Sequence, residues 1–305
     1  MPGNNTREIS FYLLGYKGNS RGLMNLQRSL SHDDHPAYRM NASETNSAFK
    51  DLNQTLQDKY VLVNWGSSKG LVGAVEKRNM LVLNNYGTDT VCNKRSFFTV
   101  YSRDLYLNLP RAFFNSEDAS RYMLDQDLSN PDKIFLVERN TLRGHSGEGI
   151  RLIYKDSSLN PEAKLWTVYV KKQREFRIHF FKGLNDRLII QQKKRIRDVP
   201  NEEINYQIRH RQGGWIYSRQ DLNVPVEVIN QAILLRNSLV NHLDFGAVDI
   251  IWNSAEQKAY ILEVNTAPGI EGETIEEYKN AILEYARLHN FNQSRSYFNP
   301  IRDSN

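Results

Sequence analysis

The sequence of 305 residues contains a single cysteine, Cys92. One thiol excludes a disulfide within the chain and any metal site built from several cysteines. No apolar run approaches the length of about 18 residues that a membrane-spanning helix needs. The first ten residues, MPGNNTREIS, lack the apolar core of a signal peptide. Internal repeats and low-complexity tracts are missing as well. We therefore expect a soluble, cytoplasmic protein.

The sequence lacks a large excess of charge of one sign, because its formal net charge is only +5. The basic residues nevertheless cluster in the segments 169–177, 191–198 and 208–214. An excess of this size fits partners that carry phosphate or carboxylate groups. It does not demand nucleic acid, because solvated faces of lysine and arginine are common. Nucleic acid is therefore not expected as a partner.

Apolar periodicity predicts a mixed α/β (α+β) fold. In the N-terminal part, apolar runs alternate with a segment in which Leu23, Leu26 and Leu30 recur at helical spacing. Strands separated by helix-length segments favour a parallel layer, which we place within residues 1–95. The expected strands are 8–15, 59–68, 80–87, 133–139, 149–154, 165–170, 175–183, 186–196, 245–252 and 259–264. The expected helices are 116–128 with Ser116 as N-cap, one that begins at Pro225 after the cap Asn223, and 275–288.

Two carboxylates lie on adjoining strands of a predicted antiparallel hairpin, 245–264. Side chains alternate between the faces of a strand, so Glu263 and Asn265 share a face. With the turn centred near Glu256, Asp249 lies opposite Glu263. Like charges across a strand pair are destabilising, so a cation has to compensate. Two carboxylates and an amide oxygen suit Mg²⁺ or Mn²⁺, whereas an arginine or lysine elsewhere in the chain is the alternative.

A glycine-rich segment, RGHSGEGI, joins the predicted strands 133–139 and 149–154. Its glycines, Gly144, Gly147 and Gly149, allow the backbone to approach phosphate groups, and His145 and Ser146 can donate hydrogen bonds to their oxygens. Alone, such a loop is more typical of an ordinary hairpin turn between these strands. Its place between a strand of nucleotide-binding type and the segment expected to form the hinge favours phosphate binding.

The motif ILEVNTAPGIEG, preceded by DFGAVDII, resembles the C-terminal metal-binding hairpin of the ATP-grasp carboxylate–amine ligases. It is most similar to the group that includes a ribosomal-protein glutamate ligase, D-alanine–D-alanine ligase and glutathione synthetase. The resemblance covers roughly residues 90–285 and implies an ATP-grasp fold with an N-terminal α/β subdomain. It implies that Asp249, Glu263 and Asn265 hold Mg²⁺ ions that bridge the phosphates of ATP.

The resemblance also implies a nucleotide site upstream of the hairpin. Lys94 corresponds to the first nucleotide-binding lysine of the family. Arg139 stands where the second lysine is usual, a departure because the guanidinium fork differs from an ammonium. The loop with Gly144, His145, Ser146, Gly147 and Gly149 would cover the phosphates. The hinge strand would offer Tyr169 and Val170 to adenine and Lys171 or Lys172 to ribose or phosphate, although the usual acid for the ribose is missing before Glu175.

Two arginines are implied as catalytic residues. Arg177, in the segment EFR, would steady the γ-phosphate or an acyl-phosphate; the alternative is an ion pair with Glu175. Arg209, in IRHRQGG, falls where related ligases contact the acyl substrate, and a plain basic loop is the alternative there. Trp65, in VNWGSS, has core packing as its expected role rather than substrate contact.

The resemblance implies an ATP- and Mg²⁺-dependent ligase with three subdomains, 1–95, 96–172 (lid) and 173–305 (metal site). A substrate carboxylate would be activated as an acyl-phosphate and joined to an amine. The substrates would be small molecules or peptides, without membrane involvement. Two other functions stay open: an ATP-grasp kinase that stops at phosphoryl transfer, and a non-catalytic basic binding protein. The identity of the substrates and the oligomeric state are not readable from the sequence.

Overall fold

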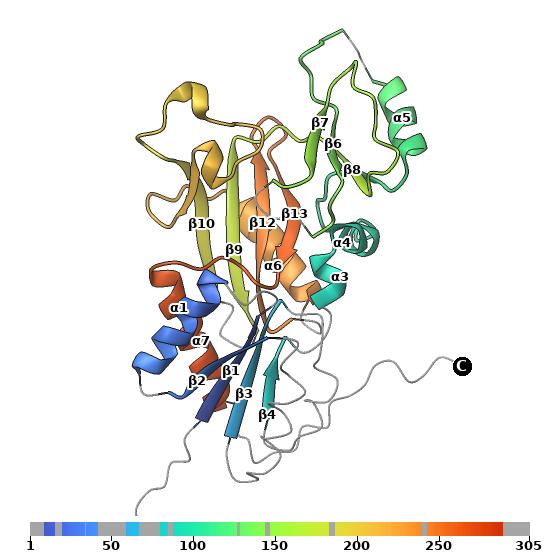
Figure 1. Ribbon diagram of the computed structural model, residues 1–305. Coiled ribbons are helices and arrows are strands. Elements are labelled where there is room, and N and C mark those ends of the chain that lie inside the picture. The colour runs from blue at the N-terminus through green and yellow to red at the C-terminus, as the bar shows by residue number, and fades with distance from the viewer. Residues whose placement is uncertain are drawn as a thin grey trace, which may run out of the picture. The chain divides into compact units, whose positions relative to one another are not determined.

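The computed structural model describes residues 9–15, 20–33, 35–41, 59–66, 80–84, 88–126, 129–143, 147–182, 187–239 and 243–288 (Figure 1). Among these residues no helix is long and apolar enough to cross a membrane. The chain divides into two compact units. The first combines Met1–Asn85 with Gly269–Asn305, and the second is Tyr86–Pro268. The subdomain boundaries expected near residues 95 and 172 stay predictions.

The first unit contains a four-stranded sheet in the order β2-β1-β3-β4. All three strand pairs are parallel, which confirms the predicted parallel α/β layer. Strand β2 was not predicted, because its five residues, AYRMN, are too few and too polar to give an apolar run. The strands are β1 (Ile9–Gly15), β2 (Ala37–Asn41), β3 (Lys59–Trp65) and β4 (Met80–Leu83).

Two helices of the first unit, α1 (Arg21–His32) and α7 (Glu273–Leu288), pack against each other beside the sheet (Figure 1). The predicted helical repeat of α1 is confirmed, since its three leucines are buried. Lys279 on α7 lies 2.6 Å from the carboxylate of Asp33, just after α1. The indole of Trp65 is fully buried against the ring of Tyr278, with 5.3 Å between the ring centroids. Core packing is therefore the role of Trp65.

The second unit contains a five-stranded antiparallel sheet in the order β11-β10-β9-β12-β13. Helix α6 (Val226–Leu239) covers one face of β12 and β13, and its apolar residues enter the core of this unit. The helix begins one residue after Pro225, which had been predicted as its first residue. The strands are β9 (Arg174–Phe181), β10 (Leu188–Arg195), β11 (Trp215–Ser218), β12 (Phe245–Asn253) and β13 (Lys258–Asn265).

A second sheet of this unit has four antiparallel strands in the order β5-β8-β6-β7. Helix α5 (Ser116–Leu124) lies beside it and contributes Ala119 to a small apolar core. Its N-cap is Asn115, whose Oδ1 accepts from the backbone N of Asp118 at 2.8 Å, so the prediction of Ser116 as the cap is wrong by one residue. The remaining elements are α3 (Thr88–Cys92), α4 (Lys94–Tyr101), β5 (Ala112–Phe113), β6 (Leu136–Arg139), β7 (Ile150–Ile153) and β8 (Leu165–Val168).

Candidate active site

The predicted carboxylate hairpin is present and has the expected register. Strands β12 and β13 pair antiparallel with Asp249 opposite Glu263 and Ala247 opposite Asn265. The ladder shifts between Asp249 and Ile250, so the regular pairing is interrupted next to the carboxylate pair. Bulges of this kind re-aim side chains and are frequent beside active sites. The two-residue period of the strands has therefore delivered both acids and the amide to one surface.

Each carboxylate is compensated by a cation from another element. Arg177 on β9 lies opposite Asp249 in the sheet, and its Nε and Nη2 donate to the two carboxylate oxygens at 2.7 and 2.8 Å. The Nζ of Lys94, the first residue of α4, lies 2.7 Å from Oε2 of Glu263. Pairing with an arginine or lysine was the open alternative to a metal, and these pairs are what the structure contains. The alternative considered for Arg177, an ion pair with Glu175, is not formed, because Arg177 pairs with Asp249.

The electrostatics of the pair follow from burial and these cations. Burial acts to raise the pKa of Glu263, but Lys94, with Arg177 and Arg139, lowers it to about 2. Burial raises the pKa of Asp249 in spite of the opposing charge of Arg177. Burial opposes the charged form of Arg177, yet Asp249 holds the pKa of this guanidinium well above its usual range. Glu263 is consequently the more firmly ionised of the two acids.

The donor set fits a hard divalent cation. The amide of Asn265 lies beside Glu263, with Nδ2 3.5 Å from Oε1, at the outer limit of a hydrogen bond. The oxygens of a carboxylate can accept from a cation and still ligate a metal with their other lone pairs. No group of three or more histidine, cysteine, aspartate or glutamate side chains that could hold a metal occurs in the described part of the chain. Two acids and an amide suit Mg²⁺, which keeps several waters or phosphate oxygens as ligands.

Arg139 is the last residue of β6, as predicted, and only 7% of it is exposed. Its Nη1 donates to Oγ1 of Thr167 on β8 at 2.9 Å, whereas its Nε has no hydrogen-bond partner among the described residues. Burial lowers the pKa of Arg139, and the charge of Glu263 opposes this shift. Within the described part of the chain, the buried guanidinium therefore keeps one N–H donor without a hydrogen-bond partner.

The glycine-rich hairpin connects β6 and β7, but Gly144, His145 and Ser146 lie outside the described residues. Gly147 and Gly149 adopt φ angles of +81° and +69°, in the left-handed region that favours glycine. A Cβ on Gly147 would lie 2.7 Å from Cγ2 of Ile208. Both glycines are therefore required by the backbone, and the phosphate-binding role of the loop stays a prediction.

The hinge segment follows β8. The backbone N of Tyr169 donates to the carbonyl of Phe135 at 2.9 Å, and the side chains of Tyr169 and Val170 are half-buried. Lys171 is exposed, whereas the next residue, Lys172, turns inward to Glu175. Contacts of this segment with adenine or ribose stay predictions.

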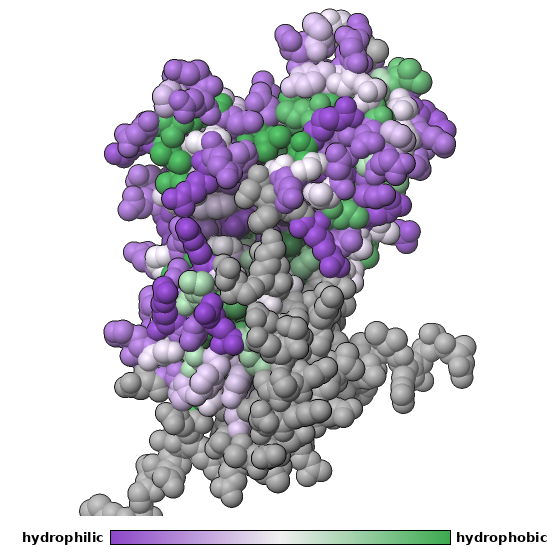
Figure 2. Space-filling view, viewed as in Figure 1, coloured by the Kyte–Doolittle hydropathy of each residue, from purple (hydrophilic) through white to green (hydrophobic). Residues whose placement is uncertain are grey.

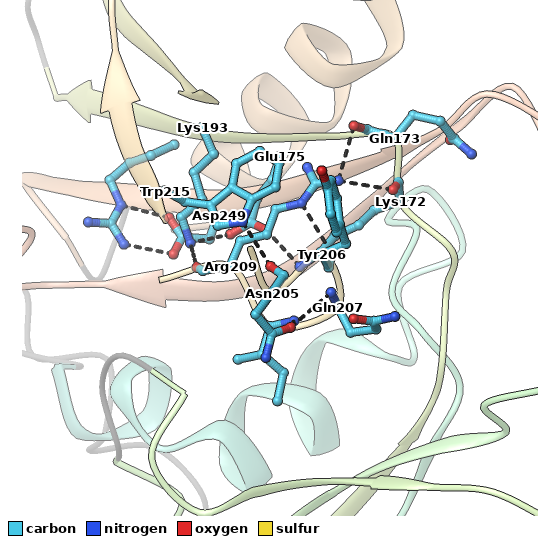
Figure 3. Close-up of polar contacts among 12 residues, drawn as sticks. Lys172, Gln173, Glu175, Lys193, Asn205, Tyr206, Gln207, Arg209, Trp215 and Asp249 are labelled. Atoms are coloured by element: carbon cyan, nitrogen blue, oxygen red, sulfur yellow. Dashed lines mark hydrogen bonds and ion pairs between the residues drawn. The ribbon is translucent and has the colours of Figure 1, made fainter. Parts of the chain in front are cut away.

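A buried charge cluster that the sequence did not predict lies beside the hinge (Figure 3). The carboxylate of Glu175 receives Nζ of Lys172 at 2.7 Å and Nζ of Lys193 at 2.6 Å. Burial acts to raise the pKa of Glu175, but the two lysines lower it. The ring of Tyr217 lies against both Lys193 and Arg177, with 5.0 and 4.4 Å to its centroid. The sequence held a signal for this contact, because antiparallel pairing of the two predicted strands, with Gln192 opposite Phe176, brings Lys193 opposite Glu175.

Arg209 lies in the same cluster and its donors are used by the chain itself (Figure 3). Its Nη2 donates to the carbonyls of Lys172 and Gln173, each at 3.2 Å, and its guanidinium stacks on Trp215 at 4.3 Å. These contacts tie the hinge to the loop that carries Arg209. The loop sequence gave no signal for Trp215 as the stacking partner. The substrate contact expected for Arg209 stays a prediction.

Comparison with known proteins supports the fold. No protein-family model matches the sequence, and no curated protein is similar to it. D-alanine–D-alanine ligase from Bacillus anthracis is 14% identical, with a TM-score of 0.62 over 92% of this chain and 98% of that chain. The macrocyclase MdnC from Microcystis aeruginosa MRC, solved with its precursor peptide MdnA, is 12% identical, with a TM-score of 0.59 over 92% and 99%. The ATP-grasp ligase PsnB, solved with a minimal precursor, is 12% identical, with a TM-score of 0.62 over 90% and 98%.

These similarities extend over nearly the full length of each protein. The chain therefore has the ATP-grasp fold, as the hairpin motif implied.

Proposed function

We propose that the protein is an ATP- and Mg²⁺-dependent ligase that activates a carboxylate as an acyl-phosphate and couples it to an amine. One observation carries the proposal: Asp249, Glu263 and Asn265 share one surface of a buried hairpin, with Lys94 and Arg177 beside them. Hard oxygen donors next to cations form a site for a metal bound to phosphates.

The charge of the site supports an anionic ligand. Cationic side chains outnumber the carboxylates among the described residues of the site, because Arg139 and Arg209 donate to neutral oxygens while Lys172 and Lys193 share Glu175. Most of these groups are buried, and buried charge needs a counter-charge. A polyphosphate supplies it. Among the structural neighbours, the Bacillus anthracis ligase was solved with ATP, and PsnB with Mg and ADP.

Different residues of the site would bind the metal, the phosphates and the adenine. Asp249, Glu263 and Asn265 would hold Mg²⁺, which neutralises phosphate charge when bound. Lys94 and Arg139 bind the phosphates, together with the backbone near Gly147 and Gly149. The half-buried side chains of Tyr169 and Val170 flank adenine. In the view of Figure 2 the surface of the second unit is mostly hydrophilic, with apolar patches among the polar side chains.

The proposed reaction has two displacements. An oxygen of the substrate carboxylate attacks the γ-phosphorus of ATP, the bond to the β,γ-bridging oxygen breaks, and ADP leaves. The nitrogen of the amine then attacks the acyl carbon, phosphate leaves with the bonding electron pair, and the amine gives up a proton. Arg177 binds the transferred phosphoryl group. Catalysis comes mainly from positioning and charge neutralisation.

The substrates are a carboxylate and an amine, each a small molecule or a peptide. Both classes occur among the names of the structural neighbours, since one is a D-alanine–D-alanine ligase and MdnC was solved with a precursor peptide. Net positive charge at the site fits the carboxylate.

ADP release measured against a panel of amino acids and peptides tests the proposal. Hydroxylamine added to the reaction intercepts an acyl-phosphate as a hydroxamate, which we expect in amounts equal to the ADP. A phosphate ester formed without hydroxamate would identify a kinase instead. No ADP release with any acceptor, together with no binding of ATP, would overturn the proposal and leave a binding protein.

A further inference from the structure

Arg139 and Thr167 form a side-chain contact between two neighbouring strands of the second unit. The sheet order places β6 beside β8, with Val137 opposite Thr167 and Arg139 opposite Leu165. Side chains two residues apart share a face, so Arg139 and Thr167 are diagonal neighbours on one face. The other face carries Glu138 and Trp166, which hydrogen-bond to each other at 3.0 Å.

Thr167 is a rigid support. Its strand is paired on both sides, with β5 through Ala112 and with β6 through Val137. Only 2% of Thr167 is exposed, and a β-branched side chain has restricted rotation about χ1. Its hydroxyl oxygen therefore occupies a fixed position.

The guanidinium of Arg139 gains a defined orientation from this oxygen. Nη1 donates to Thr167, whereas Nε, which lies on another edge of the planar group, has no hydrogen-bond partner among the residues that the structure describes. A guanidinium is a rigid fork, so fixing one corner fixes the direction of its other N–H groups. An ammonium has no such plane and would not need this support.

We propose that Thr167 is a positioning residue that orients the guanidinium of Arg139 for binding the polyphosphate of a nucleotide. The inference rests on the proposed function, because it takes the ligand to be ATP. Thr167 acts through Arg139 and does not touch the nucleotide.

The experiment measures the dissociation constant of ATP by calorimetry, without substrates, for Thr167→Val, Thr167→Ser and Arg139→Met. Valine keeps the shape of threonine and removes the oxygen, so we expect about tenfold weaker binding, the effect of one hydrogen bond to a charged group. Serine restores most of the affinity. In the Arg139→Met background Thr167→Val has no further effect, because the donor is already gone.

Two results would overturn this inference and leave the proposed function intact. One is that Thr167→Val binds ATP as tightly as the unchanged protein. The other is that the losses of ATP affinity in Thr167→Val and Arg139→Met add up in the variant that carries both substitutions. Circular dichroism and the thermal midpoint check that each variant is folded, and Thr167→Ala replaces Thr167→Val if that variant does not fold. A protein that binds no ATP even without substitution overturns the proposed function and this inference together.

Discussion

Asp249 and Glu263 lie directly across the β12–β13 hairpin from each other, and each carboxylate is held by a different cation, Arg177 and Lys94. Two anions so close together are stable only because these cations are present. In the proposed function the same arrangement orients both carboxylates toward a bound metal ion.

Glu263→Gln should remove metal binding with little change of shape. We expect loss of most Mn²⁺ bound in the presence of ATP, measured by electron paramagnetic resonance, and loss of ADP release. Glu271→Gln is the control, because Glu271 is exposed and lies outside the hairpin. EDTA should stop ADP release by the unchanged protein, and excess Mg²⁺ should restore it. Equal Mn²⁺ binding by the two variants would show that Glu263 is not a ligand.

Asp249→Asn should destabilise the chain without any ligand. The substitution leaves the guanidinium of Arg177 without its bidentate anionic partner, and breaking a buried pair costs about 3–5 kcal/mol of unfolding free energy. Urea denaturation measures the change. The control is Asp118→Asn, which breaks an exposed ion pair in which Nη1 of Arg121 lies 3.4 Å from Oδ1 of Asp118. This substitution should lower the free energy of unfolding by less than about 1 kcal/mol. Similar losses in both variants would contradict a structural role for the Asp249–Arg177 pair.

His179 should make stability depend on pH. Its Nε2 lies 3.0 Å from Oε1 of Gln191, and burial lowers its pKa from 6.5 to about 3. Below pH 6.5 the unfolded chain binds a proton that the folded chain does not, so this group's contribution to stability falls as pH decreases toward about 3. One group gives a slope of at most about 1.4 kcal/mol per pH unit.

The slope is measured by urea denaturation at several pH values across this interval. His179→Asn should flatten it, because asparagine does not titrate. An unchanged slope in His179→Asn would rule out His179 as its source.

Gly147→Ala should be more destabilising than Gly272→Ala. Both glycines have positive φ angles, +81° and +54°, so both substitutions carry the backbone cost of about 1–2 kcal/mol. Only at position 147 does the new methyl group meet an atom, Cγ2 of Ile208 at 2.7 Å, whereas nothing lies within 4 Å at position 272. Thermal denaturation compares the two variants, and equal shifts would show that Ile208 yields without cost.

The hairpin site could be predicted from the sequence because it depends on short-range rules. The alternation of side chains and the length of the turn were enough to place Asp249 opposite Glu263. The cationic partner of Asp249 could not be predicted in this way. Arg177 is 72 residues away in the sequence and becomes a neighbour only through the pairing of β9 with β12. Local spacing offered Glu175 as an alternative partner of Arg177, but Lys172 and Lys193 pair with that carboxylate instead.

Strand β2 and the cap of α5 show the limits of local patterns in the fold. Strand β2 has little apolar sequence and is held by its parallel neighbour β1. At α5 two adjacent residues, Asn115 and Ser116, are both good N-caps, and only the backbone geometry selects the first. The Trp215 side chain, which supports Arg209, lies on a strand too short to predict.

The first unit is built from both ends of the chain, since α7 packs on α1 beside the N-terminal sheet. During synthesis the ribosome delivers β1, α1 and β3 first, but the helix that covers α1 and buries Trp65 emerges only after β13. The second unit is continuous and can fold as soon as it has left the exit tunnel. We therefore expect the N-terminal sheet and α1 to stay incompletely folded until the segment 273–288 has been synthesised.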